Sequence, residues 1–384
     1  MNNITKILYV SCACSKKTED SIFRNNSGII GLQIQKYHRL LLRGFAKNGL
    51  DVCALSYQPG AEILPFGQET EDSIVFKYVR TKKKMIGHLI VLFKSFFMAK
   101  SYFKSNPNCA AFFDVLSISN CLGAILAAKI HRIPAIGIIT DFPEQLSSSN
   151  RLFSFFSWRI ISLCRGYVVM TPHMLEKLKR KRKSVVLEGH VDAEISHKKS
   201  PFRPKDQTKK CVYAGTLHEK YGIKKLVDAF LLANIDDAEL HIFGDGDSAS
   251  WIKYKANGKI VFHGIVANDV VCEFEKNATV LVNPRPSNEE FTKYSFPSKN
   301  MEYMASGTPV ITTILPGMPK EYYKYVFLFE DESVKGMANT LKDVLNKSPV
   351  ELQNKGLEAQ KFVFEQKNNI IQAKKIIDAF FHQS

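Results

Sequence analysis

The chain has 384 residues, of which 45% are hydrophobic and 23% are charged, and its formal net charge is +16. This length exceeds what one hydrophobic core usually holds, so we expect two domains of about 200 residues each, and a globular composition without internal repeats excludes a solenoid or a disordered scaffold. The positive charge indicates an anionic partner: a nucleic acid, a membrane surface or a phosphorylated ligand.

The first half of the chain alternates strand-like and helix-like segments. Several strand-like runs are apolar on both faces, which is typical of a parallel sheet covered by helices on two sides. We therefore expect an α/β, Rossmann-like domain over residues 1–197. Its predicted strands are residues 6–11, 50–56, 73–79, 110–115, 134–140, 167–171 and 184–189.

Two segments of this half, residues 73–113 and 145–175, contain no acidic residue. In both, basic side chains are interleaved with large apolar and aromatic ones, as in HLIVLFKSFFMAKSYF at residues 88–103. This pattern is typical of a surface that docks on anionic lipid, but it also fits amphipathic helices that pack on a core and expose solvated lysines. Only the net charge favours a nucleic acid, since no RNP, helix-turn-helix or zinc pattern is present, so we expect no nucleic-acid partner.

No stretch of the sequence is expected to span a bilayer, because the longest uncharged apolar segment, residues 115–128, contains polar side chains. The start of the chain is typical of a first buried strand rather than of a signal peptide. The eight cysteines are scattered, which favours reduced thiols over disulfides or a zinc site. We therefore expect a cytoplasmic protein, peripheral on the inner face of the cell membrane, that binds no metal.

A polar segment with two prolines, residues 196–210, is the predicted linker to a second domain. Strands and helices alternate again beyond it, which predicts another Rossmann-like domain over residues 208–350. Residues 351–384 have helical spacing, and we expect them to pack back toward the N-terminal domain and brace both domains. The predicted strands of the second domain are residues 210–217, 239–246, 259–266, 279–286, 308–313 and 325–331.

The second domain carries three turns that place glycine, hydroxyl or lysine where a strand-like run stops. They are YAGTLHEKYGI at residues 213–223, FGDGD at 243–247 and FPSK at 296–299. Glycine lets a backbone approach a phosphate closely, and Lys220 or Lys299 would neutralise its charge. FGDG alone is more often a plain turn, but three such turns in one domain point to a phosphate ligand, in a cleft that two facing domains would enclose.

The third turn starts a short predicted helix that ends at Gly307. A helix N-terminus offers N–H groups and the positive end of the macrodipole to an anion, and Pro297 sacrifices no bonded donor there. Ser298 adds a hydroxyl and Lys299 adds a full charge. The alternative is an ordinary capped helix with a solvated lysine.

In these motifs the sequence resembles the retaining GT-B glycosyltransferases of family 4, the glycosyl transferases group 1. The matching segments of the second half, in the family's order and spacing, are residues 213–223, 241–246, 261–266 and 283–311. In the first half the resemblance rests on a loop with Gly28 and Gly31, on the QKYHRLL helix and on TDFPEQ at 140–145. The resemblance implies two Rossmann-like domains that face a central cleft, and sugar transfer from a nucleotide-sugar donor, most often a UDP-sugar.

The resemblance also implies roles for individual residues. The diphosphate would lie over the helix start, Glu302 would bind the ribose hydroxyls, and Lys220 and Lys299 would stabilise charge on the departing diphosphate. No cofactor or metal is expected, because basic side chains and helix dipoles replace the cation. The donor-binding residues that the resemblance implies are Gly215, Thr216, Gly244, Asp245, Gly264, Ile265, Ser295, Pro297, Ser298, Lys299 and Glu302.

The acceptor is expected in the first domain. Asp141 is a candidate to orient or deprotonate the acceptor hydroxyl, unless it is an N-cap or turn aspartate. Gly28, Gly31 and His38 are further candidates, although a helix histidine is usually a surface residue. We expect a lipid-linked or oligosaccharide acceptor in surface polysaccharide or glycoconjugate biosynthesis.

Three positions depart from the family pattern. Tyr294 stands where a glutamate is often found, and Thr216 stands where an arginine often follows the glycine. Tyr221 directly precedes the second glycine of the first turn, where a lysine is usual, and Lys220 stands one residue earlier. These departures bear on the sugar-facing part of the site. Thr216 and Tyr294 leave a catalytically silent, membrane-associated or polyanion-binding protein as one alternative. A nucleotide-sugar epimerase on the same fold is another, and it would need its own acid/base pair in the cleft.

Overall fold

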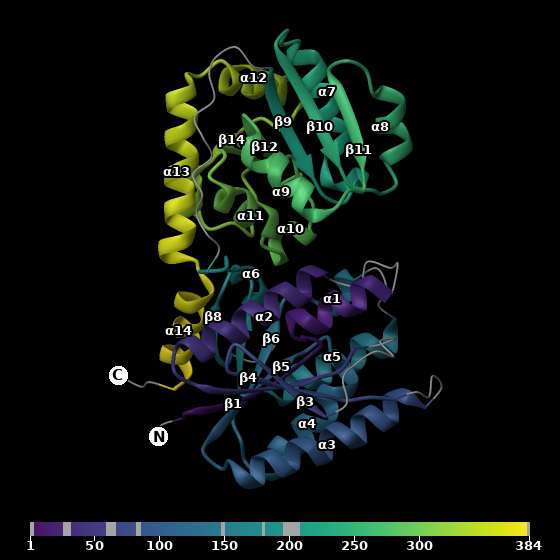
Figure 1. Cartoon of the computed structure of the whole chain (residues 1–384), viewed down its shortest axis with the longest axis vertical. Coiled ribbons are helices and arrows are strands. Elements are labelled where there is room, and N and C mark those ends of the chain that lie inside the picture. The colour runs from purple at the N-terminus through teal and green to yellow at the C-terminus, as the bar shows by residue number, and fades with distance from the viewer. Residues whose placement is uncertain are drawn as a thin grey trace. The chain divides into compact units, whose positions relative to one another are not determined.

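The computed structural model describes residues 4–25, 32–58, 67–81, 86–146, 150–178, 181–194 and 208–381. The chain divides into two compact units (Figure 1). The first unit comprises Met1–Asp192 and Asn368–Ser384, and the second comprises Ala193–Lys367. Two predicted acceptor-side residues, Gly28 and Gly31, lie outside the described residues.

The first unit contains an eight-stranded sheet in the order β3-β4-β2-β1-β5-β6-β7-β8. Neighbouring strands are parallel except β3, which is antiparallel to β4, so the predicted Rossmann-like sheet is confirmed. The sequence does not predict β3, because QETE is polar and lies at the edge of the sheet. The strands are β1 (Lys6–Ser11), β2 (Asp51–Ser56), β3 (Gln68–Glu71), β4 (Ile74–Tyr78), β5 (Cys109–Asp114), β6 (Ala135–Ile139), β7 (Gly166–Val169) and β8 (Lys183–Val186).

Helices cover both faces of this sheet, which is why β5 is buried along its whole length (Figure 1). On one side α2 packs against β2 and β4, and on the other α4 packs against β1, β5 and β6. Helix α3 packs mainly on α4 rather than on the strands. The helices are α1 (Lys16–Asn25), α2 (Leu32–Lys47), α3 (Gly87–Ser105), α4 (Ile118–Ile130), 3₁₀ helix η1 (Pro143–Gln145), α5 (Arg151–Leu163), α6 (Pro172–Lys177) and α14 (Asn369–Phe380).

The second unit contains a six-stranded sheet in the order β11-β10-β9-β12-β13-β14, with every neighbouring pair parallel. This is the second predicted Rossmann-like sheet. Its strands are β9 (Lys209–Ala214), β10 (Ala238–Phe243), β11 (Ile260–Gly264), β12 (Val280–Asn283), β13 (Val310–Thr313) and β14 (Phe327–Phe329). Its helices are η2 (Glu219–Tyr221), α7 (Ile223–Ala233), α8 (Ala249–Lys255), α9 (Asn268–Asn277), α10 (Phe291–Tyr294), α11 (Ser298–Ser306), η3 (Lys320–Tyr325), α12 (Val334–Leu345) and α13 (Pro349–Gln366).

The C-terminal helices belong to different units, whereas the sequence suggests one tail over residues 351–384. Helix α13 packs against α11 and η3 in the second unit. Gly356 allows its close approach there, because a Cβ atom at this position would lie 2.0 Å from the Gly307 carbonyl oxygen. Helix α14 packs against α2 in the first unit, where the Asn369 side chain donates to the Leu40 carbonyl oxygen at 3.0 Å.

Candidate functional site

The strand order of the second unit reverses at β9, whose neighbours are β10 and β12. In doubly wound sheets, ligands bind beyond the carboxyl ends of the strands at such a reversal. The loop after β9 begins at Gly215, and the loop after β12 begins at Pro284. Topology alone therefore places the first predicted turn at the expected ligand position.

The turns after β9, β10 and β11 are joined by backbone hydrogen bonds. The Gly215 N–H donates to the Phe243 carbonyl oxygen at 2.9 Å, and the Gly244 N–H donates to the Gly264 carbonyl oxygen at 2.8 Å. Gly244 has a φ of +126°, and a Cβ atom there would lie 1.8 Å from the Gly215 carbonyl oxygen, so only glycine fits. The structure thus brings together the glycines of three turns that the sequence places far apart.

Lys299 lies directly over the turn after β9. A Cβ atom at Gly215 would lie 2.4 Å from Lys299 Cε and 3.1 Å from its Nζ, so the lysine fills the space that a side chain at residue 215 would need. Lys299 is the second residue of α11, after the N-cap Pro297 and the exposed first residue Ser298. A helix N-terminus, a lysine and a glycine turn therefore meet at one place, which is an arrangement suited to a phosphate.

Two buried side chains, not predicted from the sequence, hold α11 in this position. Asn300 accepts a hydrogen bond from Asn283 Nδ2 at 2.7 Å and donates to Thr312 Oγ1 at 3.1 Å. The Tyr303 hydroxyl accepts from the Ala214 N–H at 2.9 Å and donates to the Ala214 carbonyl oxygen at 3.2 Å. Helix α11 is thereby tied to β12, β13 and β9. The sequence signal is a pair of asparagines, one in the helix and one at the end of an apolar strand.

Lys220 and Arg285 lie over the same two aromatic rings. Lys220 Nζ is 5.4 Å from the centroid of the Tyr221 ring and 5.7 Å from that of Phe291. The central guanidinium carbon of Arg285 is 5.1 Å and 5.5 Å from the same centroids. Both contacts are cation–π interactions, and together they concentrate positive charge beside the turn after β9. Arg285 is not predicted from the sequence, although its place just after the β12 strand is the available signal.

Tyr213 connects Arg285 to the turn beneath Lys299. Its hydroxyl donates to the Thr216 carbonyl oxygen at 2.8 Å and lies 3.2 Å from where a Cβ atom on Gly215 would be. Burial raises the pKa of the Tyr213 phenol well above its ordinary value, and nearby Arg285 offsets only part of that rise. The phenol therefore stays protonated and keeps the turn fixed.

The FGDGD turn after β10 supports the loop that carries Lys220. The Asp247 carboxylate accepts the Glu219 N–H at 3.0 Å and lies 3.0 Å from His218 Nδ1. Asp245, the predicted donor-binding aspartate, contributes its carbonyl oxygen, which accepts the Leu217 N–H at 2.9 Å. Asp247 is a further residue that sequence reasoning did not select.

The predicted nucleoside-binding residues lie at the edges of this cluster. Glu302 is half-buried and follows Lys299 by three residues, so both lie on one face of α11. Ile265 is 63% exposed and directly follows Gly264, whose φ is +68°. Ser295 accepts a hydrogen bond from Arg285 Nη1 at 3.4 Å. Their roles toward the ribose, the nucleobase and the sugar stay predictions.

In the first unit, Asp141 follows β6 and is half-buried. It is not the N-cap of η1, as one alternative had it, because Phe142 occupies that position. The Phe142 ring is fully buried and stacks on Trp158 at a centroid distance of 5.4 Å. On the other side of Asp141, the Thr140 hydroxyl is buried without a hydrogen-bond partner among the described residues. Asp141 is thus followed by a residue whose ring is fixed in the core.

His38 is fully buried, which corrects the view that a histidine in this helix is a surface residue. Its Nδ1 lies 2.6 Å from the Tyr9 hydroxyl oxygen, and its Nε2 lies 3.5 Å from Asp114 Oδ2. Burial by itself raises the pKa of the Asp114 carboxyl, but His38 and a hydrogen bond from Ser117 lower that pKa below its ordinary value overall. The geometry gives His38 a place in the core and no surface that an acceptor would contact.

His190 is a second enclosed histidine of the first unit. Its Nε2 lies 2.9 Å from the Tyr37 carbonyl oxygen, and its ring centroid is 4.6 Å from that of Tyr37. Burial lowers the pKa of His190 to about 4, because the surroundings disfavour the charged ring. His190 is therefore neutral at neutral pH.

Metal-ligating residues do not gather within the described ranges, where no group of three or more His, Cys, Asp or Glu side chains is placed to hold an ion. All eight cysteines are free thiols, and six of them are buried. Within the same ranges, no helix is long and apolar enough to cross a membrane. That the chain needs no metal for its reaction stays a prediction.

Residues 208–347 match the family model described as glycosyl transferases group 1. A comparison with curated proteins gives no significant match. Among solved structures, the chain is similar to the apo form of the lipopolysaccharide outer core galactosyltransferase WaaB, with 16% identity, a TM-score of 0.62, and coverage of 98% of this chain and 99% of that chain.

Two further solved structures are similar over nearly the whole chain. Anabaena HepE in complex with UDP has 13% identity and a TM-score of 0.66, with 97% of this chain and 98% of that chain covered. Sucrose-phosphate synthase from Thermosynechococcus elongatus has 14% identity and a TM-score of 0.64, with 97% of both chains covered. At these identities the likeness establishes the fold. With the family match spanning β9 to α12, residues 208–347 form a glycosyl transferases group 1 domain, and the chain is a glycosyltransferase with the GT-B fold.

Proposed function

We propose that the chain transfers a sugar from a UDP-sugar to a lipid-linked or saccharide acceptor, with retention of the anomeric configuration and without a metal. The observation that carries this proposal is the position of Lys299, at the start of α11 and against Gly215. This arrangement would receive the diphosphate of the donor. The choice of UDP is supported by the structural likeness to HepE, whose structures were determined with UDP and with UDP and glucose.

Catalysis in this proposal is electrostatic. Transfer of the sugar breaks the bond between its anomeric carbon and the diphosphate oxygen, and negative charge develops on the departing diphosphate. Lys299, Lys220 and the α11 dipole would stabilise that charge more strongly in the transition state than in the bound donor. Arg285 adds a third positive charge, positioned by the rings that Lys220 also contacts.

The acceptor part of the proposal rests on the first unit. Asp141, which is half-buried where the chain leaves β6, would orient or deprotonate the acceptor hydroxyl. Exposed apolar and basic side chains on the first unit support a lipid-linked acceptor and a location at the cytoplasmic face of a membrane. Synthesis of a surface polysaccharide or glycoconjugate is the setting that such an acceptor would serve.

The first experiment is a thermal-shift titration with UDP, GDP, ADP, CMP and TDP, each with and without EDTA. A ligand that binds only the folded state raises its stability in proportion to the logarithm of ligand concentration over Kd. We expect the largest shift with UDP, unchanged by EDTA. No shift with any nucleotide would contradict the proposal and favour a catalytically silent protein.

Analysis of the reaction products distinguishes a transferase from the remaining alternative, a nucleotide-sugar epimerase. With a UDP-sugar and a membrane extract as the source of acceptor, a transferase releases UDP and leaves the sugar on the acceptor. An epimerase would instead return a different sugar from the same donor. In Lys299→Ala we expect loss of most turnover, and near-normal turnover in that variant would refute the role of this lysine.

A further inference from the structure

Three helices of the first unit adjoin one another and together contain no acidic residue. Helix α4 packs against α3 on one side and against α5 on the other (Figure 1). The approach of α3 to α4 is close, because a Cβ atom at Gly123 would lie 2.0 Å from the Leu92 carbonyl oxygen. Segments that lie up to about 60 residues apart in the sequence therefore form one surface, the α3–α5 face, made of residues 86–105, 118–132 and 151–163.

Large apolar side chains project from this face into solvent. Phe93 and Phe97 are 58% and 62% exposed and are spaced by one helical turn on α3, and Phe155 on α5 is 63% exposed. Nine of the fifteen exposed large hydrophobic side chains of the described residues belong to the face: Ile86, Leu89, Phe93, Phe97, Leu126, Ile130, Leu152, Phe155 and Phe156. Such a concentration on one side of a protein marks an interaction surface.

The charges of the same face select an anionic partner. Its exposed basic residues are Lys94, Lys100, Lys104, Lys129, Arg132, Arg151 and Arg159. The neighbouring acidic side chain, Glu144 on η1, accepts a hydrogen bond from the Trp158 indole at 2.5 Å. A face whose own charged residues are all positive, with exposed rings among them, complements a lipid surface with anionic headgroups, where the rings enter the headgroup region.

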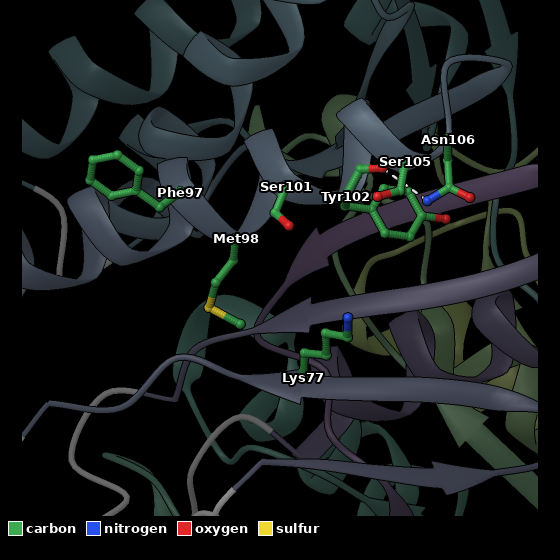
Figure 2. Close-up of a pocket in the computed structure, with 7 residues that line it drawn as sticks. All are labelled: Lys77, Phe97, Met98, Ser101, Tyr102, Ser105 and Asn106. Atoms are coloured by element: carbon green, nitrogen blue, oxygen red, sulfur yellow. Dashed lines mark hydrogen bonds between the residues drawn. The ribbon is translucent and has the colours of Figure 1, made fainter.

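A cavity of about 430 Å³ opens between α3 and β4 at the margin of this face (Figure 2). Figure 2 shows Lys77 extending from β4 toward the α3 side of the cavity, where Ser105 and Asn106 lie. Phe97 and Met98 line the same cavity. An ammonium group and polar side chains beside an aromatic ring suit a phosphate whose alkyl chain continues along the apolar surface.

We propose that the α3–α5 face docks on an anionic phospholipid bilayer, with Phe93 and Phe97 inserted among the headgroups and a headgroup phosphate in the Lys77 cavity. This inference rests on the proposed function, since it names the surface that would bring the enzyme to a lipid-linked acceptor. None of the residues involved belongs to the donor site of the second unit.

The test is co-sedimentation of the whole chain with vesicles of phosphatidylcholine alone or mixed with phosphatidylglycerol. The wild type should bind the mixed vesicles and lose binding as salt is raised. Phe93→Gln/Phe97→Gln should weaken binding at least tenfold, because two inserting rings are removed. The matched control Tyr254→Gln removes an 86% exposed ring from α8 in the second unit and should bind as the wild type does.

Charge variants test the electrostatic contribution to vesicle binding. Each positive charge near an anionic surface is worth roughly a fivefold change in binding, so Lys100→Glu/Lys104→Glu should weaken it more than tenfold and Lys77→Gln about fivefold. Lys335→Glu/Lys342→Glu makes the same change in net charge on α12, where both lysines are exposed, and should leave binding within about twofold. Equal losses from the two double charge variants would overturn the assignment of the face, and an unaffected Lys77→Gln would overturn that of the cavity.

The UDP thermal shift distinguishes failure of this inference from failure of the proposed function. If the wild type shows the UDP shift but does not bind mixed vesicles, the docking surface is refuted and the donor site stands. If the wild type binds mixed vesicles but no nucleotide raises its melting temperature, the proposed function fails and the docking surface stands. A self-associating protein that Phe93→Gln/Phe97→Gln dissociates, without vesicle binding, would show that a second copy covers the face and would refute the bilayer.

Discussion

Gly215→Ala should weaken UDP binding by displacing Lys299 while leaving the fold intact. The new Cβ atom would start 2.4 Å from Lys299 Cε, so the lysine end must move by about 1 Å to reach ordinary van der Waals separation. Gly215 is not among the glycines with positive φ, so its backbone accepts alanine. Because a flexible side chain yields rather than the backbone, we expect the free energy of unfolding to change by less than about 1 kcal/mol.

The effect on UDP follows from what the lysine supplies. A hydrogen bond to a charged group contributes about 2 kcal/mol, which is roughly a thirtyfold change in Kd. We therefore expect a rise in the Kd for UDP of about thirtyfold in Lys299→Ala, and of about tenfold in Gly215→Ala, where the lysine is moved but present. Isothermal titration calorimetry with UDP measures both, and urea denaturation measures stability.

The double variant decides whether the two substitutions act through one contact. If Gly215→Ala acts only by moving Lys299, then Gly215→Ala/Lys299→Ala should bind UDP no more weakly than Lys299→Ala alone. Additive losses, about three-hundredfold in total, would refute the reasoning. Gly258→Ala is the matched control, because nothing lies within 4 Å of a Cβ atom there, and it should bind UDP normally.

Three further predictions concern stability. Asn300→Ala should lower the free energy of unfolding by about 2 to 3 kcal/mol in urea denaturation, since it leaves the buried Asn283 amide without its acceptor. Gly123→Val should separate α3 from α4, costing about 1 to 3 kcal/mol by the same measurement and weakening vesicle binding. The folded pKa of His190, about 4, lies below its ordinary value of 6.5, so the unfolded state takes up the proton first as pH falls. Stability should therefore fall between pH 6.5 and 4, by up to about 3 kcal/mol, and urea midpoints across this range should fall less in His190→Gln.

Both parallel sheets follow from the sequence because their strands are apolar on both faces and are bounded by turn residues. The sequence does not predict β3, since a polar edge strand carries no such pattern. The three turns that the sequence predicts to bind phosphate follow strands of one parallel sheet, and the switch-point rule places them at the same edge of that sheet. The side-chain contacts that fix the site could not be predicted from the sequence. Asn300, Arg285 and Asp247 contact residues that are distant in the sequence and meet them only after the sheet has formed. Hydrophobic periodicity does not indicate which distant residues will come into contact.

His38 shows the same limit in the first unit. A polar residue in an amphipathic helix predicts exposure, yet His38 is fully buried because Tyr9 and Asp114 supply polar partners from two neighbouring strands. Those partners are distant in the sequence and are paired by the sheet order β1-β5. Burial of a titratable side chain can therefore be recognised only when the three-dimensional structure shows which polar partners surround it.

The division of the C-terminal helices between the two units has a consequence for how the protein is made. Ala373 and Ile376 of α14 are fully buried in the core of the first unit, against Leu41 and Phe45 of α2. The ribosome synthesises residues 193–367 before these residues, so the unit that emerges first must wait with part of its apolar core uncovered until the last helix arrives. The second unit, which is contiguous in the sequence, has all of its parts earlier. Order of synthesis and order of completion are thus opposite in this chain.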